Sequence, residues 1–130
     1  MKRSRTWMIA ALLTTISLAA HAGSKLTANM VVTVDKTNLR ASGQLGSTRA
    51  SSDKVSIIGC ITSVSGTTAY ILCEAQDAKS QYLSCWSNVP AYVQVGASLK
   101  SDSYISFAAD ASGSCTALTI NTDSAYAPKQ

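Results

Sequence analysis

Residues 55–75 read VSIIGCITSVSGTTAYILCEA, and this stretch decides the fold. Two arms rich in β-branched and aromatic residues, Val55–Val64 and Thr67–Ala75, flank a turn at Ser65-Gly66. Such a pattern predicts an antiparallel β-hairpin. Because the apolar residues of both arms are nearly continuous, we expect these strands to be covered on both faces or to lie centrally in a sheet.

Shorter strand patterns lie on both sides of the hairpin. We expect strands at 30–34, near 39–41 within the loop 36–53, and at 81–86, 103–109 and 115–120. Asp110 and Gly113 occupy the first and last positions that a type I turn favours, so the last two strands form a second hairpin. The fold is therefore expected to be mainly β: an antiparallel sandwich or small barrel of about six short strands.

Residues 88–99 fit two patterns. An apolar stripe at helical spacing runs through Val89, Tyr92, Val93, Gly96 and Leu99. Pro90 stands where the first turn of a helix tolerates proline. Apolar residues also alternate from Ala91 to Leu99, as they would in a strand. Of the two, we favour one short helix.

Residues 1–22, MKRSRTWMIAALLTTISLAAHA, have the three parts of a secretory signal peptide. Three cations come first, a mostly apolar stretch of 14 residues follows, and Ala20-His21-Ala22 is a small-residue cleavage site. We expect a single domain over residues 23–130, secreted or periplasmic. No apolar run reaches the ~20 residues that cross a bilayer, so no membrane insertion is expected after cleavage.

Removal of the signal peptide changes the charge and the available chemistry. The whole chain carries a net charge of +4, but three of its 11 Lys and Arg lie in the signal, so residues 23–130 carry +1. Their cations are dispersed, whereas nucleic-acid binding needs clustered cations, so we expect no nucleic-acid partner. His21 is the one histidine, which excludes a histidine-based nucleophilic triad from residues 23–130.

The four cysteines, Cys60, Cys73, Cys85 and Cys115, predict two disulfides in a small exported domain. A hairpin centred on residues 77–80 would join Cys73 to Cys85 and leave Cys60 for Cys115, the pairing we favour. The alternative follows from the first hairpin, where pairing of Val64 with Ala69 would place Cys60 opposite Cys73.

No metal site or cofactor is expected. The cysteines lack a C-x-x-C pair, and residues 23–130 contain no histidine to complete a zinc site. Asp102, Asp110 and Asp123 lie near the ends of the last strands and offer the oxygen ligands of Ca²⁺, but without a known calcium-loop spacing. Turn formation accounts for Asp110 on its own.

The candidate binding residues are Tyr82, Trp86 and Tyr92. Tyr82 and Trp86 share one face of a short strand, where exposed aromatic rings would form a platform for a glycan or a protein. The competing interpretation, which we favour, places Trp86 in the core beside Cys85, because tryptophan is highly buried on average.

Catalytic motifs are missing from the sequence. Glycoside hydrolysis needs two positioned carboxyl groups, and the sequence offers one glutamate, Glu74, and six aspartates with no motif that pairs them. No serine lies in a G-x-S-x-G turn, and a Ser–Lys dyad has no motif to support it. No catalytic residue is therefore predicted.

Several short motifs resemble those of small uncharacterised exported bacterial proteins with four cysteines. They are Gly43-Gln-Leu-Gly46, Arg49, Asp53, Ile58-Gly59-Cys60, Ser103-Tyr104-Ile105-Ser106-Phe107 and Cys115. The resemblance spans most of residues 23–130 and implies export and a disulfide-bonded β-fold. That group carries no assigned activity, so the resemblance transfers no site.

These observations predict an exported, non-enzymatic binding domain whose partner is a protein or an envelope glycan. One alternative is an inhibitor of secreted hydrolases that presents the loop Glu74–Ser84, pinned by a disulfide. The other is a small hydrolase with a carboxylate or Ser–Lys site.

Overall fold

The computed structural model describes residues 30–123 and 125, so the predicted signal peptide, residues 1–22, lies outside the described residues. The described chain forms strands β1 (Thr33–Asp35), β2 (Arg40–Gln44), β3 (Ile57–Ser65), β4 (Thr68–Gln76), β5 (Tyr82–Ser87), β6 (Tyr104–Ala109) and β7 (Cys115–Asn121). It also forms two short helices, α1 (Leu45–Arg49) and α2 (Pro90–Gly96). Neither helix is long and apolar enough to cross a membrane.

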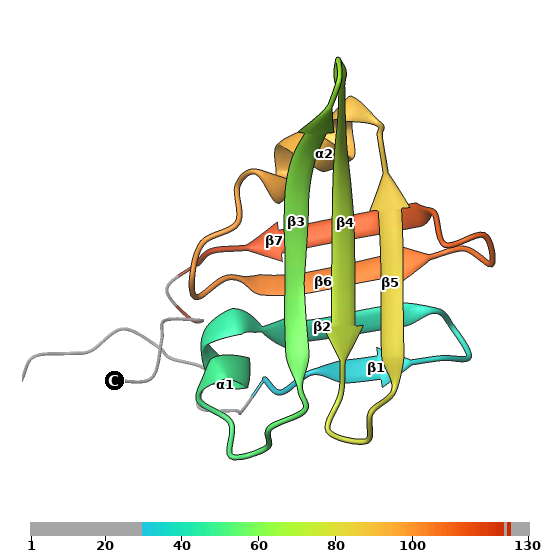
Figure 1. The fold of residues 1–130 in the computed structure, drawn as a ribbon. Coiled ribbons are helices and arrows are strands. Elements are labelled where there is room, and N and C mark those ends of the chain that lie inside the picture. Colours follow the sequence, from blue (N-terminus) through green and yellow to red (C-terminus); the bar gives the residue numbers. More distant parts are fainter. Residues whose placement is uncertain (1–29, 124, 126–130) are drawn as a thin grey trace, which may run out of the picture.

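The strands form two antiparallel sheets packed face to face. One sheet has the order β3-β4-β5 and the other β1-β2-β6-β7. Figure 1 shows the strands of the first sheet running across those of the second, with α2 at one end of the sandwich and α1 beside the lower end of β3. The predicted mainly-β antiparallel sandwich is confirmed.

The central hairpin forms because its turn suits the twist of the strands. Ser65 pairs with Thr68, so Gly66 and Thr67 make a two-residue turn, and Gly66 has φ 60°. A positive φ at the first turn position is typical of a type II′ hairpin and favours glycine there. The register then runs without a shift from Ser65–Thr68 to Ile57–Gln76. It places Val64 opposite Ala69 and Cys60 opposite Cys73.

The disulfides are Cys60–Cys73 and Cys85–Cys115, so the pairing favoured from the sequence is wrong. Cys73 lies opposite both Cys60 on β3 and Cys85 on β5. The two pairs differ in geometry, because β4 directs alternate backbone groups to each neighbouring strand. Cys60–Cys73 is a non-hydrogen-bonded pair with a Cα–Cα distance of 4.0 Å. Side chains lie closer in such pairs than in hydrogen-bonded pairs such as Cys73–Cys85, which suits the short reach of a disulfide.

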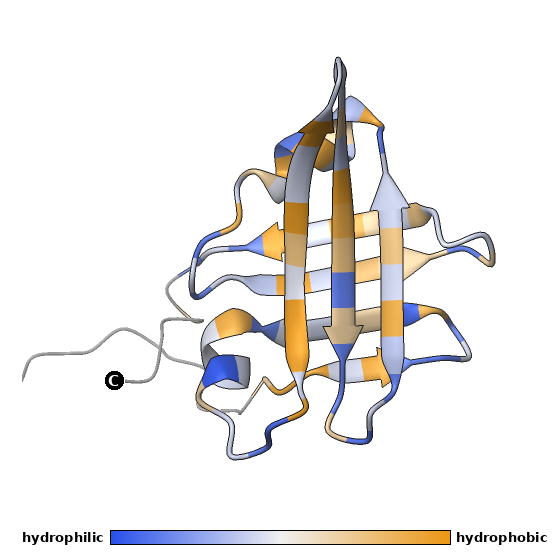
Figure 2. Cartoon of the chain, in the orientation of Figure 1, coloured by the Kyte–Doolittle hydropathy of each residue, from blue (hydrophilic) through white to orange (hydrophobic). Residues whose placement is uncertain are grey.

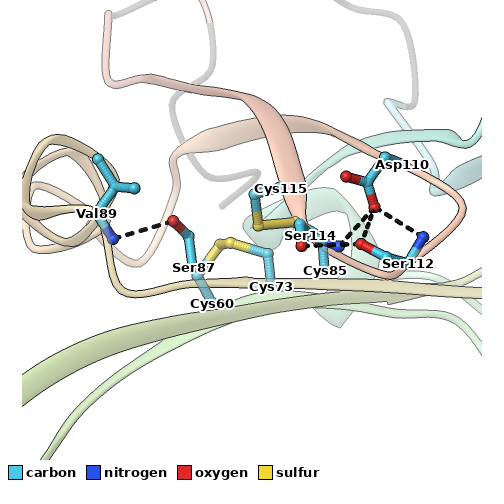
Figure 3. The surroundings of a disulfide bond; sticks show 9 residues. All are labelled: Cys60, Cys73, Cys85, Ser87, Val89, Asp110, Ser112, Ser114 and Cys115. Atoms are coloured by element: carbon cyan, nitrogen blue, oxygen red, sulfur yellow. Dashed lines mark hydrogen bonds between the residues drawn. A yellow bond between two sulfur atoms is a disulfide. The ribbon is translucent and has the colours of Figure 1, made fainter.

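The second disulfide joins the two sheets. Cys85 lies on β5 and Cys115 at the start of β7, with a Cα–Cα distance of 4.9 Å. Next to it, the backbone N–H of Trp86 donates to Gly113 O at 3.0 Å, and Trp86 forms an isolated parallel β-bridge with Ser114. Figure 3 shows the two disulfides beside the turn held by Asp110, whose carboxylate accepts the N–H groups of Ser112 and Ser114. The predicted turn at Asp110–Gly113 is confirmed by the Gly113 N–H bond to Asp110 O.

A tryptic digest tests the disulfide pairing directly. Cleavage after Lys54, Lys79 and Lys100 releases peptide 55–79 with both Cys60 and Cys73. Without reduction, we expect that peptide alone, closed by an internal disulfide, and peptide 80–100 joined to the peptide that contains Cys115. Mass spectrometry distinguishes this from the other pairing, in which all three peptides would stay joined.

The core lies between the sheets and includes Ile71, Ile105 and Phe107, each at most 1% exposed. As predicted, β4 is the central strand of its sheet. The prediction that both hairpin strands are central or covered on both faces is wrong for β3, an edge strand that exposes Ile57 and Ile61. Nothing among the described residues covers the outer face of this sheet, and Figure 2 shows that much of β3 and β4 is hydrophobic.

One of the two helices was predicted from the sequence and the other was not. The favoured helix in residues 88–99 is confirmed as α2, with Pro90 in its first turn. α1 was not expected, because residues 36–53 were predicted to be mostly loop. It forms where the buried Gln44 side chain donates to Asp102 O at 3.2 Å and accepts the Ser47 hydroxyl at 2.7 Å.

Candidate functional site

Three rows of side chains on the outer face of the β3-β4-β5 sheet cross all three strands. The pairings define the rows Ile61–Leu72–Trp86, Gly59–Glu74–Ser84 and Ile57–Gln76–Tyr82. Neighbouring strands lie about 5 Å apart, so each row is a continuous strip. A Cβ atom built at Gly59 would have no heavy atom within 4 Å, which leaves this part of the face open.

The first row is an exposed apolar strip. Ile61 is 54% exposed and Trp86 51% exposed, with half-buried Leu72 between them. The favoured interpretation that Trp86 is a core residue is therefore wrong. Cys85 points inward and is 1% exposed, so the alternation of a strand turns the next side chain, Trp86, outward.

Tyr82 and Glu74 add a polar element to the same face. The Tyr82 hydroxyl donates to Glu74 Oε2 at 2.9 Å. Partial burial of the hydroxyl and this hydrogen bond raise the pKa of Tyr82 above its ordinary value. The Lys36 ammonium group donates to Tyr82 O at 2.8 Å, which holds the end of β5 in place. The face thus carries one ordered phenol–carboxylate pair beside its apolar row.

Tyr92 does not belong to this face. It lies on α2, is partly buried and packs against the hydrophobic core. α2 contacts β4 and β7, between the two sheets at one end of the sandwich, rather than the outer face of the β3-β4-β5 sheet. The structure therefore brings together two of the three candidate aromatic residues, Tyr82 and Trp86. Sequence reasoning missed Ile61 and Leu72, which only the strand pairings place beside Trp86.

No protein family, curated protein or solved structure matches the chain.

The aspartates serve the turns rather than a common site. Five of them accept backbone N–H groups from residues two to four positions further along, at 2.6–3.0 Å: Asp35, Asp53, Asp77, Asp110 and Asp123. This is the Asx-turn geometry, in which the carboxylate satisfies its own loop. Within residues 30–123 and 125, no three His, Cys, Asp or Glu residues gather as metal ligands would.

These turns predict an acid-sensitive fold. The N–H groups of Ser56 and Val55 lower the pKa of Asp53 from 3.8 to about 2, and hydrogen bonds also lower the pKa of Asp35 and Asp110. Carboxyl groups with a lower pKa when folded favour the folded state above pH ~4, and this contribution is lost as the pH falls toward ~2. We expect the urea midpoint to fall over that interval.

The control for this prediction is Asp53→Asn, which keeps an Asx-turn acceptor but cannot titrate. Its urea midpoint should change less between about pH 4 and about pH 2 than that of the wild type. Equal pH dependence of the two proteins would contradict the assignment to Asp53.

Two shallow grooves flank the sheet. One, of about 420 Å³, lies between α1 and the lower end of β3, and the polar Thr48, Arg49 and Ser56 contribute to its lining. The other, of about 550 Å³, lies between the Gly66 turn and α2 and is lined by uncharged residues that include Asn88 and Gln94. Neither lining contains a carboxyl group, so neither groove has the acid–base pair that hydrolysis requires.

Proposed function

We propose that this chain is an exported, non-catalytic binding module that holds another protein against the outer face of its β3-β4-β5 sheet. The observation that carries the proposal is the exposed row Ile61–Leu72–Trp86. Exposed tryptophan and aliphatic side chains in one continuous strip are typical of protein interfaces, where Trp and Tyr contribute most of the binding free energy. The two disulfides fit the proposed location outside the cytoplasm.

An envelope glycan is the second candidate, and a different observation favours it. Tyr82 and Trp86 stand four residues apart on one strand, about 13 Å along the sheet, with Glu74 and Ser84 between them. Rings that stack on sugars, with carboxylate and hydroxyl groups between them, are suited to a polysaccharide. The exposed Ile57 and Ile61 favour the protein partner instead, because aliphatic side chains offer sugar hydroxyls no hydrogen bonds.

The two alternative functions have weaker support. The inhibitor hypothesis relied on a Cys73–Cys85 bond to pin the loop Glu74–Ser84, whereas Cys73 is bonded to Cys60 and Cys85 to Cys115. In the hydrolase hypothesis Glu74 is the best carboxylate, and its side chain is engaged by the Tyr82 hydroxyl. If Glu74→Gln abolished turnover of a cell-wall substrate in a folded protein, the binding proposal would fail.

The test compares three immobilised proteins: wild type, Trp86→Ala and Val89→Ala. Val89 is 48% exposed but lies at the start of α2, so its variant is a matched control for lost apolar surface. Tryptophan is enriched among the hot-spot residues whose truncation costs 2 kcal/mol or more, so we expect Trp86→Ala to retain at least about tenfold less of an envelope protein than the other two. Equal retention by all three would refute the proposal, and the same pattern with purified cell-wall glycan would transfer it to the second candidate.

A further inference from the structure

The edge of β3 carries backbone groups that have no partner strand. Because Ser65–Thr68 closes a two-residue turn, it is a hydrogen-bonded pair, and alternate residues from Ser65 to Ile57 bond to β4. The N–H and C=O groups of Ile58, Cys60, Thr62 and Val64 therefore point away from β4, outward from the open edge of the sheet. Among the described residues, no hydrogen bond uses these groups.

The other edge strands of the described sandwich are protected. On β5, Tyr82 O accepts the Lys36 ammonium group and the Trp86 N–H donates to Gly113 O. β1 is only three residues long, and β7 contacts α2 and pairs with β6 through a register shift at Ala108/Ala109. Short strands, covering lysines and irregular pairing are the devices by which sheets avoid adding a further strand.

β3 contacts α1 near its lower end, across the groove lined by Leu45, Ile57 and Ile58, but it is neither short, charged nor irregularly paired. It is nine residues long, pairs with β4 without a register shift and contains no charged residue and no proline. A long, regular, uncharged edge is a template for another strand. Its composition favours a partner strand that is equally uncharged, and β3 of a second copy meets that condition.

We propose that two copies of this chain dimerise by antiparallel pairing of β3 with β3. The pairing in which all nine residues overlap places Ile61 opposite Ile61, Cys60 opposite Thr62 and Ile58 opposite Val64. In this register the four outward-directed residues of each copy meet one another and form about eight backbone hydrogen bonds. The two three-stranded sheets become one six-stranded sheet, with the row Ile61–Leu72–Trp86 continued across the two-fold axis.

The groove beside α1 complements this register. It follows the lower end of β3 and is lined by Leu45, Ile57 and Ile58 among others. Val64, at the protruding end of the hairpin, is 67% exposed, the largest value among the exposed large hydrophobic residues of the described chain. The register sets Val64 of the second copy opposite Ile58, with both side chains on the inner side of the sheet, at this groove. The two-fold axis repeats the contact, so both exposed valines become covered.

The dimer uses the edge of β3 and leaves the outer face of the sheet open, so it stands independently of the proposed function. Sedimentation equilibrium of the oxidised protein should show a concentration-dependent monomer–dimer equilibrium. Thr62→Pro removes one outward N–H and leaves the bonds to β4 intact, as proline is tolerated where the N–H of an edge strand faces solvent. We expect it to weaken the dimer at least about tenfold, while Thr62→Val, which keeps the N–H, dimerises like the wild type.

A cysteine pair tests the register and does not depend on the proline variant. The described cysteines are all in disulfides, so a new thiol has no partner within its own copy. In the proposed register the cysteine of Ile61→Cys lies opposite the same cysteine of the second copy, in a non-hydrogen-bonded pair like that of Cys60 and Cys73. The cysteine of Ser63→Cys lies opposite Gly59 and has no thiol to meet. Under mild oxidation we expect roughly tenfold more covalent dimer from Ile61→Cys than from Ser63→Cys.

Three results would overturn the proposal. They are a wild type that stays monomeric at every concentration, a dimer that Thr62→Pro does not weaken in a folded protein, and equal cross-linking of the two cysteine variants. A monomeric wild type whose β3 edge instead binds an extended segment of another protein would replace the second copy by that partner. None of these outcomes depends on whether Trp86 binds a protein.

Discussion

Gly96→Ala is expected to destabilise the protein by about 1–3 kcal/mol, because the added methyl group has no room. Gly96 is buried in α2, and a Cβ atom there would overlap Ile71 Cδ1, with Thr62 Cγ2 at 3.2 Å. Ile71 is fully buried on the central strand and cannot move aside without disturbing the core. In an exposed helix alanine would stabilise by up to about 1 kcal/mol relative to glycine, so a loss of stability isolates the packing effect.

A double mutant identifies the responsible contact. Ile71→Val removes the Cδ1 methyl and by itself costs about 1 kcal/mol. Because Ile71→Val also removes the overlap, the double variant should lose much less stability than the sum of the two single variants. Chemical denaturation of the four proteins gives this coupling. Gly59→Ala, where no heavy atom lies within 4 Å of the added Cβ, is the control and should change the stability little. Additive costs for Gly96→Ala and Ile71→Val would contradict the contact.

Removal of the Cys85–Cys115 disulfide is expected to cost more than removal of Cys60–Cys73. Their sequence separations are 30 and 13 residues. The loop-entropy relation gives about 3.7 kcal/mol for the longer loop and about 3 kcal/mol for the shorter. We expect the two losses of stability to differ by more than loop entropy alone gives. Cys60–Cys73 joins strands that are already paired along nine residues, whereas Cys85–Cys115 joins the two sheets.

The measurement compares the two Cys→Ala double variants with the wild type by denaturant unfolding. Either loss is a large share of the ~5–15 kcal/mol that stabilises a typical domain. The fully reduced wild type is the control and should be less stable than either variant. A larger loss on removing Cys60–Cys73 would show that the bond between the sheets contributes less than the bond within one sheet.

Residues that act locally were predictable from the sequence. Gly66, Asp110 and Gly113 mark turns because their backbone or side-chain chemistry suits those positions, and both hairpins formed there. Pro90 and the apolar stripe favoured the helix in residues 88–99 over a strand, and α2 is found there. The placement of Tyr82 and Trp86 on one face of β5 also followed from the two-residue period of a strand.

Features that depend on contacts between residues far apart in the chain were not predictable from the sequence. Helix α1 has little helical preference of its own and forms where Gln44 reaches Asp102 O, 58 positions away in the chain. The exposure of Trp86 depended on which face of β5 meets the second sheet, and a strand pattern does not contain that information.

The cysteines show the limit of what a local sequence pattern can predict. By itself, the sequence determined the strands, their turns and the presence of two disulfides, since spacing and side-chain chemistry act over a few residues. It also placed Cys60 and Cys85 within reach of the same Cys73, and could not choose between them. Only the tertiary structure decided, because the choice depends on which strand pair is non-hydrogen-bonded at Cys73 and on the second sheet that brings Cys115 to Cys85. The same packing of one sheet on the other left the row Ile61–Leu72–Trp86 and the edge of β3 exposed.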